Sequence, residues 1–341
     1  MSETTVPSAA TPSVTPSVTP PVTPPVTPPV TPPVTPPVTP PVTPPVTPPV
    51  RNVTLTQDLI TLTKPKIISL LLVTTIAPMF VAGSPSWLTV LWVTIGGYLM
   101  AGGANAVNMY LDRDIDDVMV RTKLRPIPSG RMSPRAVIAF GVLIATAATY
   151  GLAQLVNVLT ATLALAGFYF YVFIYTRWLK RSSPHNIVIG GAAGAFPPLV
   201  GWAAVTGSLD LGAWYLFLII FYWTPPHFWA LALNKQRDYG NAGVPMAPLV
   251  WGERETIEQM LWYTVLLVAL TLLPVCFGLF GITYAVCAAV LGGLLLKGVL
   301  QVYRERNSGN WVRASWWVYK YSLLYLALLF VAMVVDRHVG R

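Results

Sequence analysis

The feature that most constrains this chain is a series of long apolar segments from Lys64 onward. Each is close to the roughly 20 residues that an α-helix needs to cross a bilayer. The nine segments lie at 65–82, 87–108, 135–155, 158–175, 186–206, 212–233, 257–279, 281–301 and 316–335. Composition agrees, because 54% of the 341 residues are apolar and 10% are charged. The sequence therefore predicts an all-α, polytopic membrane protein with nine transmembrane helices.

The loops between these segments alternate in charge. Those at 83–86, around Asn157, at 207–210 and near Gly281 contain no Lys or Arg, whereas the opposite loops carry nearly all of them. The positive-inside rule places the basic loops in the cytoplasm, so the N-terminus is expected inside and the C-terminus outside. The net charge of +9 is thereby a topology signal, and nucleic acid is not an expected partner.

The first fifty residues differ from the rest, with eight consecutive TPPV units at 19–50. This proline density excludes helix and sheet ladders and predicts a disordered, extended tail. Residues 51–341 then form one membrane domain. The absence of basic residues before Arg51 argues against a transit peptide or a secretory signal and favours a bacterial plasma membrane.

The stretch NMYLDRDIDD (108–117) concentrates four aspartates at the predicted cytoplasmic end of the second span. Asn108, Asp112 and Asp116 follow an i, i+4, i+8 spacing, so a helix continuing past the span would place them on one face. A solvated acidic loop is one interpretation. The other is a Mg²⁺ site, because this ion takes hard oxygen ligands, often one or two carboxylates plus substrate phosphates.

Basic residues directly after the stretch favour the metal interpretation. Arg121, Lys123 and Arg125 could bind phosphate oxygens, since guanidinium groups contact them in bidentate fashion. Together with the metal they would form a diphosphate clamp. Asp114 and Asp117 point away from the stripe and are expected to be solvated or paired with Arg113.

Several stretches carry a resemblance to known families. NMYLDRDID and the following RTKLRPIPSGRMSP resemble the first aspartate-rich motif of the UbiA superfamily of intramembrane prenyltransferases. LTKPKIISLLL, SSPHNIVIGGAAGAFPPLVGW, TPPHFWALAL and DYGNAGVPMAPLV resemble its protohaem IX farnesyltransferase branch. The resemblance implies nine helices of UbiA type. It also implies transfer of farnesyl from farnesyl diphosphate to a vinyl group of haem B, giving haem O and diphosphate.

The same resemblance implies roles for individual residues. Asn108, Asp112 and Asp116 would bind Mg²⁺ and diphosphate, with Arg121 and Arg125 as diphosphate contacts and Lys64 as a further candidate. The second motif usually has two aspartates, but NKQRDY offers only Lys235 and Asp238. Lys235 could instead contact a diphosphate oxygen or a haem propionate.

Histidines and aromatic residues leave alternatives open. His227 could orient substrate, bond a carbonyl freed by nearby prolines or ligate haem iron, and His185 could start a helix or contact haem. The faces of Trp223, Phe228 and Trp229 could stabilise an allylic cation or simply pack.

Two other functions remain open at this stage. A quinone-precursor prenyltransferase would share the diphosphate site, and a transporter would also have many spans. The sparse charge inside the segments argues against the transporter. Membrane lipid and, from the resemblance, a haem-modifying enzyme or terminal oxidase are expected partners.

Overall fold

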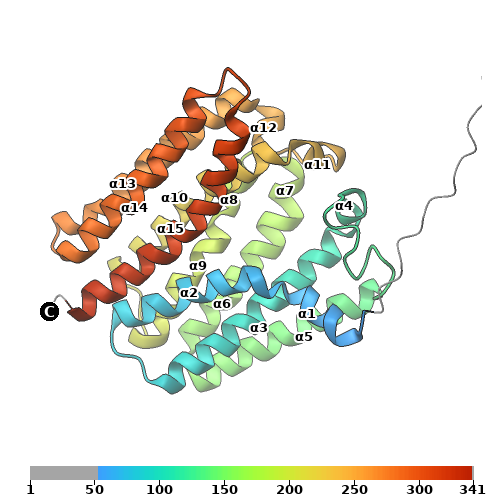
Figure 1. Ribbon diagram of the computed structural model, residues 1–341. Coiled ribbons are helices and arrows are strands. Elements are labelled where there is room, and N and C mark those ends of the chain that lie inside the picture. Colours follow the sequence, from blue (N-terminus) through green and yellow to red (C-terminus); the bar gives the residue numbers. More distant parts are fainter. Residues whose placement is uncertain (1–52, 340–341) are drawn as a thin grey trace, which may run out of the picture. The chain divides into compact units, whose positions relative to one another are not determined.

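The computed structural model describes residues 53–339, so the tail predicted at 1–50 lies outside the described residues. Within that range, nine helices are long and apolar enough to cross a membrane, which confirms the predicted number. Figure 1 shows a bundle built from helices throughout. Two of the nine spans are composites of consecutive helical segments.

The spans, in chain order, are α2 (Pro65–Ala82), α3 (Trp87–Leu111), α5 (Pro134–Leu155), α6 (Val158–Tyr169) continued by η1 (Phe170–Leu179) and α7 (Lys180–Ser182), α8 (Asn186–Gly190) continued by α9 (Ala192–Thr206), α10 (Leu211–Asn234), α13 (Glu253–Cys276), α14 (Ile282–Arg304) and α15 (Trp311–Val339). The remaining short helices are α1 (Leu55–Thr63), α4 (Arg113–Val118), α11 (Gln236–Asn241) and α12 (Ala247–Val250).

Polar residues between the apolar segments start the helices. Ser86 Oγ accepts from the backbone N–H of Thr89 at 3.0 Å, and Asn157 Oδ1 accepts from that of Thr160 at 2.8 Å. Asp210 caps α10 in the same way. Each side chain satisfies a donor that the first helical turn leaves free. The loops identified by their lack of basic charge are thus also the points where new spans begin.

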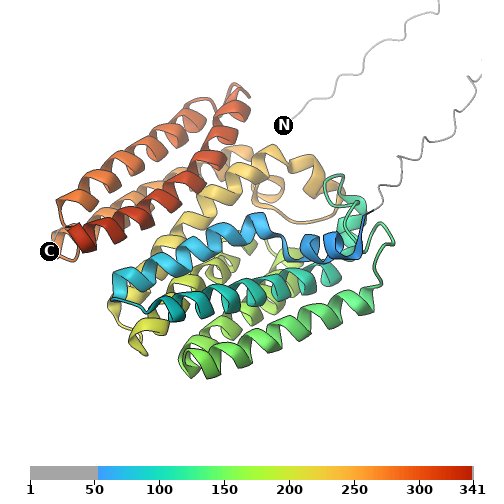
Figure 2. The same ribbon diagram turned by 60° about the horizontal axis from the view of Figure 1, so that its bottom comes forward.

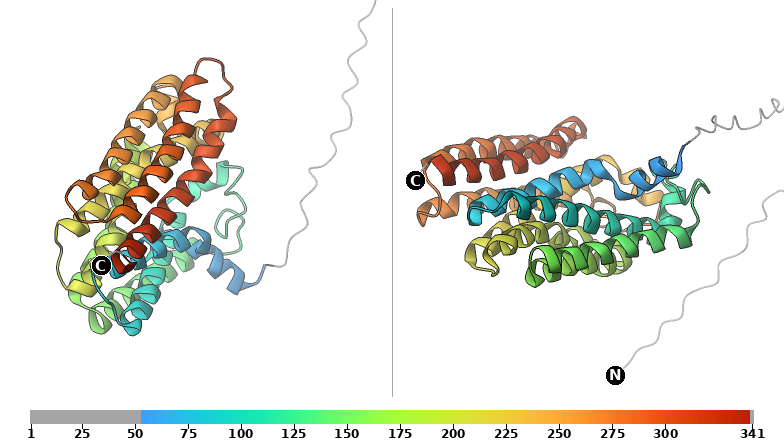
Figure 3. Two further views of the ribbon diagram at one scale, coloured as in Figure 1. Left: turned by 60° about the vertical axis from the view of Figure 1, so that its left-hand side comes forward. Right: turned by 90° about the horizontal axis from the view of Figure 1, so that it is seen from below.

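Packing places the spans in layers. α3 packs along α5, α2 along α9, and α14 along α15, while α10 contacts α9, α13 and α15. The last span also packs against the first, α2, as Figure 2 shows. In Figure 3, α14 and α15 form one flank, α5 forms the opposite flank, and α2 and α3 lie between them. A Cβ at Gly201 in α9 would lie 1.8 Å from the Thr75 carbonyl oxygen, so α2 and α9 approach this closely because of glycine.

One end of the bundle gathers the short helices. α4, α11 and α12 lie where α3 and α10 end, together with the loop that follows α4 (Figure 1). We call this end the site end. It carries the acidic stretch, the second motif and the first residues of α15.

Candidate active site

The acidic stretch lies at the junction of α3 and α4. α3 ends at Leu111 and α4 begins at Arg113, with Asp112 as the residue between them. The helical hydrogen-bond pattern still passes through the junction, because Asp112 N donates to Asn108 O at 2.9 Å and Asp116 N donates to Asp112 O at 2.7 Å. All three side chains are buried. The predicted spacing therefore brings Asn108, Asp112 and Asp116 to one buried site.

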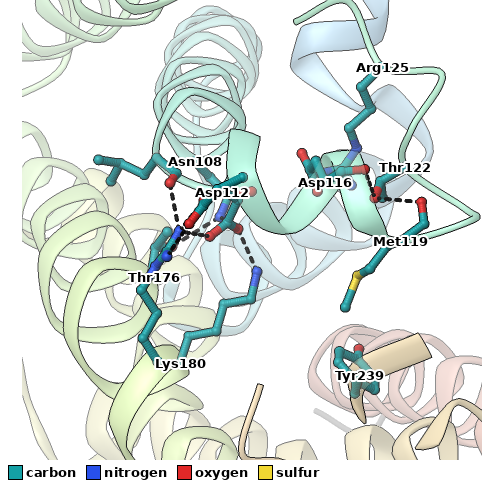
Figure 4. A network of polar contacts seen from close by, with 12 residues as sticks. Asn108, Asp112, Asp116, Met119, Thr122, Arg125, Thr176, Lys180 and Tyr239 are labelled. Carbon is teal, nitrogen blue, oxygen red and sulfur yellow. Dashed lines mark hydrogen bonds and ion pairs between the residues drawn. The ribbon is translucent and has the colours of Figure 1, made fainter. Parts of the chain in front are cut away.

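Asn108 and Asp112 form the centre of a polar network, shown in Figure 4. Asp112 Oδ2 accepts from Lys180 Nζ at 2.5 Å and from Asn108 Nδ2 at 2.8 Å. The same Asn108 amide donates to Thr176 Oγ1 at 3.1 Å, and its oxygen accepts from Lys64 Nζ at 3.1 Å. Side chains from two other segments, the α1–α2 junction and the η1–α7 helix, thus converge on one amide and one carboxylate.

Asp116 has its own cation. Arg125 Nη1 lies 2.6 Å from Asp116 Oδ2, and Figure 4 shows Arg125 reaching it from the loop after α4. Thr122 Oγ1 donates to the Asp116 carbonyl at 3.0 Å and fixes the turn between them. Arg125, expected to contact diphosphate, therefore lies at the site and pairs with a carboxylate there.

An ion pair between exposed Arg131 and buried Asp58 holds the loop that carries Arg125. Arg131 binds Asp58 of α1 with Nε at 3.1 Å from both carboxylate oxygens and Nη2 at 2.9 Å from Oδ1. Arg131 also donates to the Leu124 carbonyl at 3.0 Å. Because α1 ends directly before Lys64, the Asp58–Arg131 pair links the two segments that carry Lys64 and Arg125.

The other two aspartates lie outside the network around Asn108. Asp117 is exposed, as expected. Asp114 is also exposed but pairs with Arg181 at 2.7 Å rather than with Arg113, which donates instead to the Tyr110 carbonyl. The hydrogen bond from Arg181 lowers the pKa of Asp114 to about 2. The exposure of Asp114 agrees with the solvated alternative, and the pairing with Arg113 is wrong because Arg113 folds back onto its own helix.

The π-helical segment η1 and the short helix α7 that continues it contribute residues that the sequence did not indicate. Thr176, Lys180 and Arg181 all reach the stripe, and Arg181 Nη2 lies 3.6 Å from Asp112 Oδ1. Lys180 and Arg181 were interpreted only as topology signals. π-helical turns occur often at functional sites, because the wider turn redirects side chains. The only local signal for Lys180 and Arg181 was their position in a basic run at the end of a span.

Lys64 occupies a strained position between α1 and α2. Its φ of 55° is the only positive value for a non-glycine residue within 53–339. Burial, and then the neighbouring charges of Arg125 and Lys180, lower the pKa of Lys64 to about 7. A cation crowded by other cations is a favourable partner for an incoming anion.

The second motif lies beside the first but holds fewer carboxylates. Lys235 Nζ and Asp238 Oδ2 are 4.0 Å apart. Arg121, expected at the diphosphate, donates to the Tyr239 hydroxyl at 3.2 Å and lies over its ring. It therefore joins the loop after α4 to α11, and in this structure it contacts neither aspartate of the stripe.

The histidines have distinct surroundings. His227 is buried between the rings of Trp223 and Tyr319, at 4.4 and 4.9 Å between centroids, and its Nδ1 lies 2.8 Å from Ser322 Oγ. His185 is exposed and lies against Trp251. Its side chain makes no cap bond to α8, so the expected helix-start interaction is wrong.

The aromatic candidates separate in the same way. Trp229 is buried edge-on against Trp251 and Tyr263, which makes it a packing residue. Trp223 lies on His227 and donates to the Ser322 carbonyl at 2.8 Å. Phe228 is half-buried against His227.

The stripe has the donors that a hard cation requires. Asp112 Oδ1 is buried and has no hydrogen-bond partner among the described residues, although a buried polar atom normally has one. The carboxylates of Asp112 and Asp116 bind only side-chain groups, which are Lys180, Arg181 and the Asn108 amide at Asp112 and Arg125 at Asp116, and a metal ion could replace the cations. Two carboxylates and an amide oxygen match the protein share of a Mg²⁺ site completed by phosphate oxygens and water.

The sequence is similar to those of proteins from one known family. Residues 70–334 match the UbiA prenyltransferase family. The chain is 57% identical over 288 residues to a protein of Roseiflexus castenholzii named protoheme IX farnesyltransferase, covering 84% of this chain and 53% of that one. A Symbiobacterium thermophilum protein of the same name is 51% identical over 283 residues, covering 82% of this chain and 94% of that one. The chain thus spans about half the length of the first relatives and nearly all of the second.

Solved structures share the fold at low identity. A digeranylgeranylglyceryl phosphate synthase superposes with a TM-score of 0.68 at 19% identity, over 83% of this chain and 98% of that one. A UbiA homologue from Archaeoglobus fulgidus bound to GPP and Mg²⁺ gives 0.62 at 16% identity, over 81% and 99%. The match of residues 70–334 to the family and the 51–57% identities to the named relatives carry the assignment. This multi-pass membrane protein, with nine apolar helices in its described residues, belongs to the UbiA prenyltransferase family.

Proposed function

We propose that the protein transfers the farnesyl group of farnesyl diphosphate to a vinyl group of haem B, with addition of water, giving haem O and diphosphate. The observation that carries this proposal is the 51% identity to the Symbiobacterium protoheme IX farnesyltransferase over 94% of that protein's length. The buried stripe supports it, because two carboxylates surrounded by four cations suit a metal diphosphate.

The proposed site divides the work between carboxylates and cations. Asn108, Asp112 and Asp116 would hold Mg²⁺, which neutralises charge on the diphosphate leaving group when bound. Lys180 and Arg125 now neutralise the two aspartates. Each can turn from its carboxylate to a phosphate oxygen, because a long flexible side chain carries the charge. Lys64 adds a half-buried amine whose pKa of about 7 would rise, favouring the charged form, beside a bound diphosphate.

The reaction needs no protein nucleophile. The C–O bond between farnesyl carbon one and diphosphate breaks, with the electron pair leaving on the diphosphate. The terminal vinyl carbon of haem forms the new C–C bond to carbon one, and water adds to the adjacent cationic carbon with loss of a proton. The cationic side chains assist by stabilising the negative charge that develops on the leaving oxygens.

We propose the membrane orientation from the charge pattern. The basic loops at 113–135, 177–181 and 235–254 belong to the site end, so the positive-inside rule opens the site toward the cytoplasm of a bacterial plasma membrane. The N-terminus would then be cytoplasmic and the C-terminus extracytoplasmic. The proposed recipient of haem O is a haem-modifying enzyme or a terminal oxidase, because so apolar a product stays in the membrane.

A product assay tests the function. Purified protein in detergent with farnesyl diphosphate, Mg²⁺ and haem B should form a compound with the mass of haem O. Under the same conditions 4-hydroxybenzoate should remain unchanged. Prenylation of the phenolic acid alone would instead establish a quinone-precursor enzyme, and turnover without any membrane gradient would exclude an obligate transport role.

A further inference from the structure

A hollow of about 830 Å³ lies at the start of α15, outside the network around Asn108. Its lining residues all come from one short segment of the chain: Gly309, Asn310, Val312, Arg313, Trp316 and Lys320. Figure 1 places the loop between α14 and α15 at the same end of the bundle as α12. We call this feature the basic hollow.

The basic hollow carries unbalanced positive charge. Arg313 and Lys320 are exposed, and neither has an acidic partner within 4.0 Å in residues 53–339. They lie seven residues apart, about 10 Å along the helix axis and nearly on one face. Trp316 lies between them on that face, half-buried. The arrangement presents two separated cations beside one aromatic ring.

A third cation joins the hollow to the second motif. Lys235, at the end of α10, has its ammonium 5.8 Å from the centre of the Trp316 ring. Trp316 contacts Tyr319, and Tyr319 lies on His227. A continuous line of rings therefore leads from the basic hollow into the seam between α10 and α15. An ordinary interfacial tryptophan, with basic side chains that extend toward lipid headgroups, would also place these residue types near the end of a span.

The α14 helix shows what that ordinary arrangement looks like. Lys297 and Arg304 are exposed and also seven residues apart near the same end, yet neither lines the basic hollow. Two features set the α15 pair apart: the concave surface between the cations, and the third cation supplied by a different helix. Such a surface fits a ligand that carries two carboxylates on one edge of a flat apolar body.

We propose that the basic hollow binds the two propionate groups of the haem acceptor through Arg313 and Lys320, with Lys235 as the third cation. This inference rests on the proposed function, because it assigns the acceptor's end of the same reaction. The macrocycle would lie along the ring-lined seam, with its vinyl edge directed away from the propionates. The diphosphate keeps its separate set of cations at Lys64, Lys180 and Arg125.

A binding experiment with the purified full chain tests the proposal. Haem B is titrated against wild type, R313Q/K320Q and the matched control K297Q/R304Q, with absorbance and tryptophan quenching as readouts. Loss of two charge-assisted contacts should weaken haem B binding on the order of tenfold or more in R313Q/K320Q only. Its KM for haem B should rise while its KM for farnesyl diphosphate stays the same.

The haem dimethyl ester supplies the decisive comparison, since it keeps the macrocycle and lacks the charges. Wild type and R313Q/K320Q should bind the ester equally, and R313K/K320R should restore haem B binding. Equal haem B affinity in R313Q/K320Q and the control pair would overturn the proposal. So would an equal loss for the ester, or a deficit that appears only with anionic lipid present, which would assign the hollow to a lipid headgroup.

The proposed function and this inference fail in different ways. If wild type forms no haem O from haem B, the proposed function fails. If wild type forms haem O and R313Q/K320Q retains full affinity for haem B, only the propionate site fails.

Discussion

Asp112 and Asp336 are both buried carboxylates, and their partners differ in kind. Asp336, near the end of α15, accepts from the backbone N–H of Gly281 at 2.7 Å and of Tyr284 at 3.1 Å. Both of its oxygens are thereby used to cap α14. Asp112 binds Lys180 and Asn108 through one oxygen, while its other oxygen has no hydrogen-bond partner within the described range.

The difference separates a structural carboxylate from one that can exchange ligands. Backbone donors cannot move without unwinding the helix, so Asp336 is committed to its cap. Side-chain cations can turn away, and Asp112 Oδ1, which has Arg181 at 3.6 Å but no hydrogen bond, gains free energy when a ligand binds it. Substitutions at the two positions should therefore affect different measurements.

The largest expected effect is on turnover in Asp112→Asn. The change keeps the volume and removes the charge that would hold Mg²⁺, so turnover should fall by on the order of 10²–10³ or more while the protein stays folded. Product formation by mass spectrometry measures it. Asp117→Asn, the same change on an exposed carboxylate five residues away, should remain active. Wild-type turnover of Asp112→Asn at limiting Mg²⁺ would contradict a metal role for the stripe.

Removing the cation instead of the carboxylate should affect stability. Lys180→Gln leaves Asp112 buried without its nearest countercharge, which should lower the free energy of unfolding by about 3–5 kcal/mol. The double variant Asp112→Asn/Lys180→Gln should recover most of that loss, as unfolding in detergent would show. Arg177→Gln, at an exposed position of η1 three residues earlier, is the control. An equal loss in the single and double variants would mean that the two side chains are not coupled.

Asp336→Ala should lower stability without lowering turnover. It leaves the buried N–H of Tyr284 and the N–H of exposed Gly281 without their acceptor, for a loss of about 1–3 kcal/mol in the free energy of unfolding, with turnover at low temperature unchanged. Asp210 caps α10 from an exposed position where water can replace it, so Asp210→Ala should cost less. Lost turnover in folded Asp336→Ala would refute its purely structural role.

The same two carboxylates show what the sequence could predict. The spans and the Asn108 stripe were predictable because hydrophobic length and i, i+4 spacing are local properties. The cation that binds Asp112 was not, because Lys180 lies 68 residues away, directly after a π-helical segment, and looks like any basic residue after a span. Asp336 gave no signal either, since its partners are backbone groups 52 and 55 residues away. Pairings between distant segments depend on packing that no short pattern records.

The smallest expected effect concerns the hydrogen bonds that hold Asn108 beside Asp112. Thr176 Oγ1 accepts from the Asn108 amide, which also donates to Asp112. Thr176→Val keeps the shape and removes that acceptor, and one hydrogen bond of about 0.5–1.5 kcal/mol corresponds to a rise of roughly twofold to tenfold in the apparent Mg²⁺ requirement. Thr162→Val, an exposed hydroxyl bonded only within its own helix, should leave the Mg²⁺ dependence unchanged. If both variants match wild type, Asn108 is held by Asp112 and Lys64 alone, and this span contributes to the site through Lys180 and Arg181 of α7 rather than through Thr176 of η1.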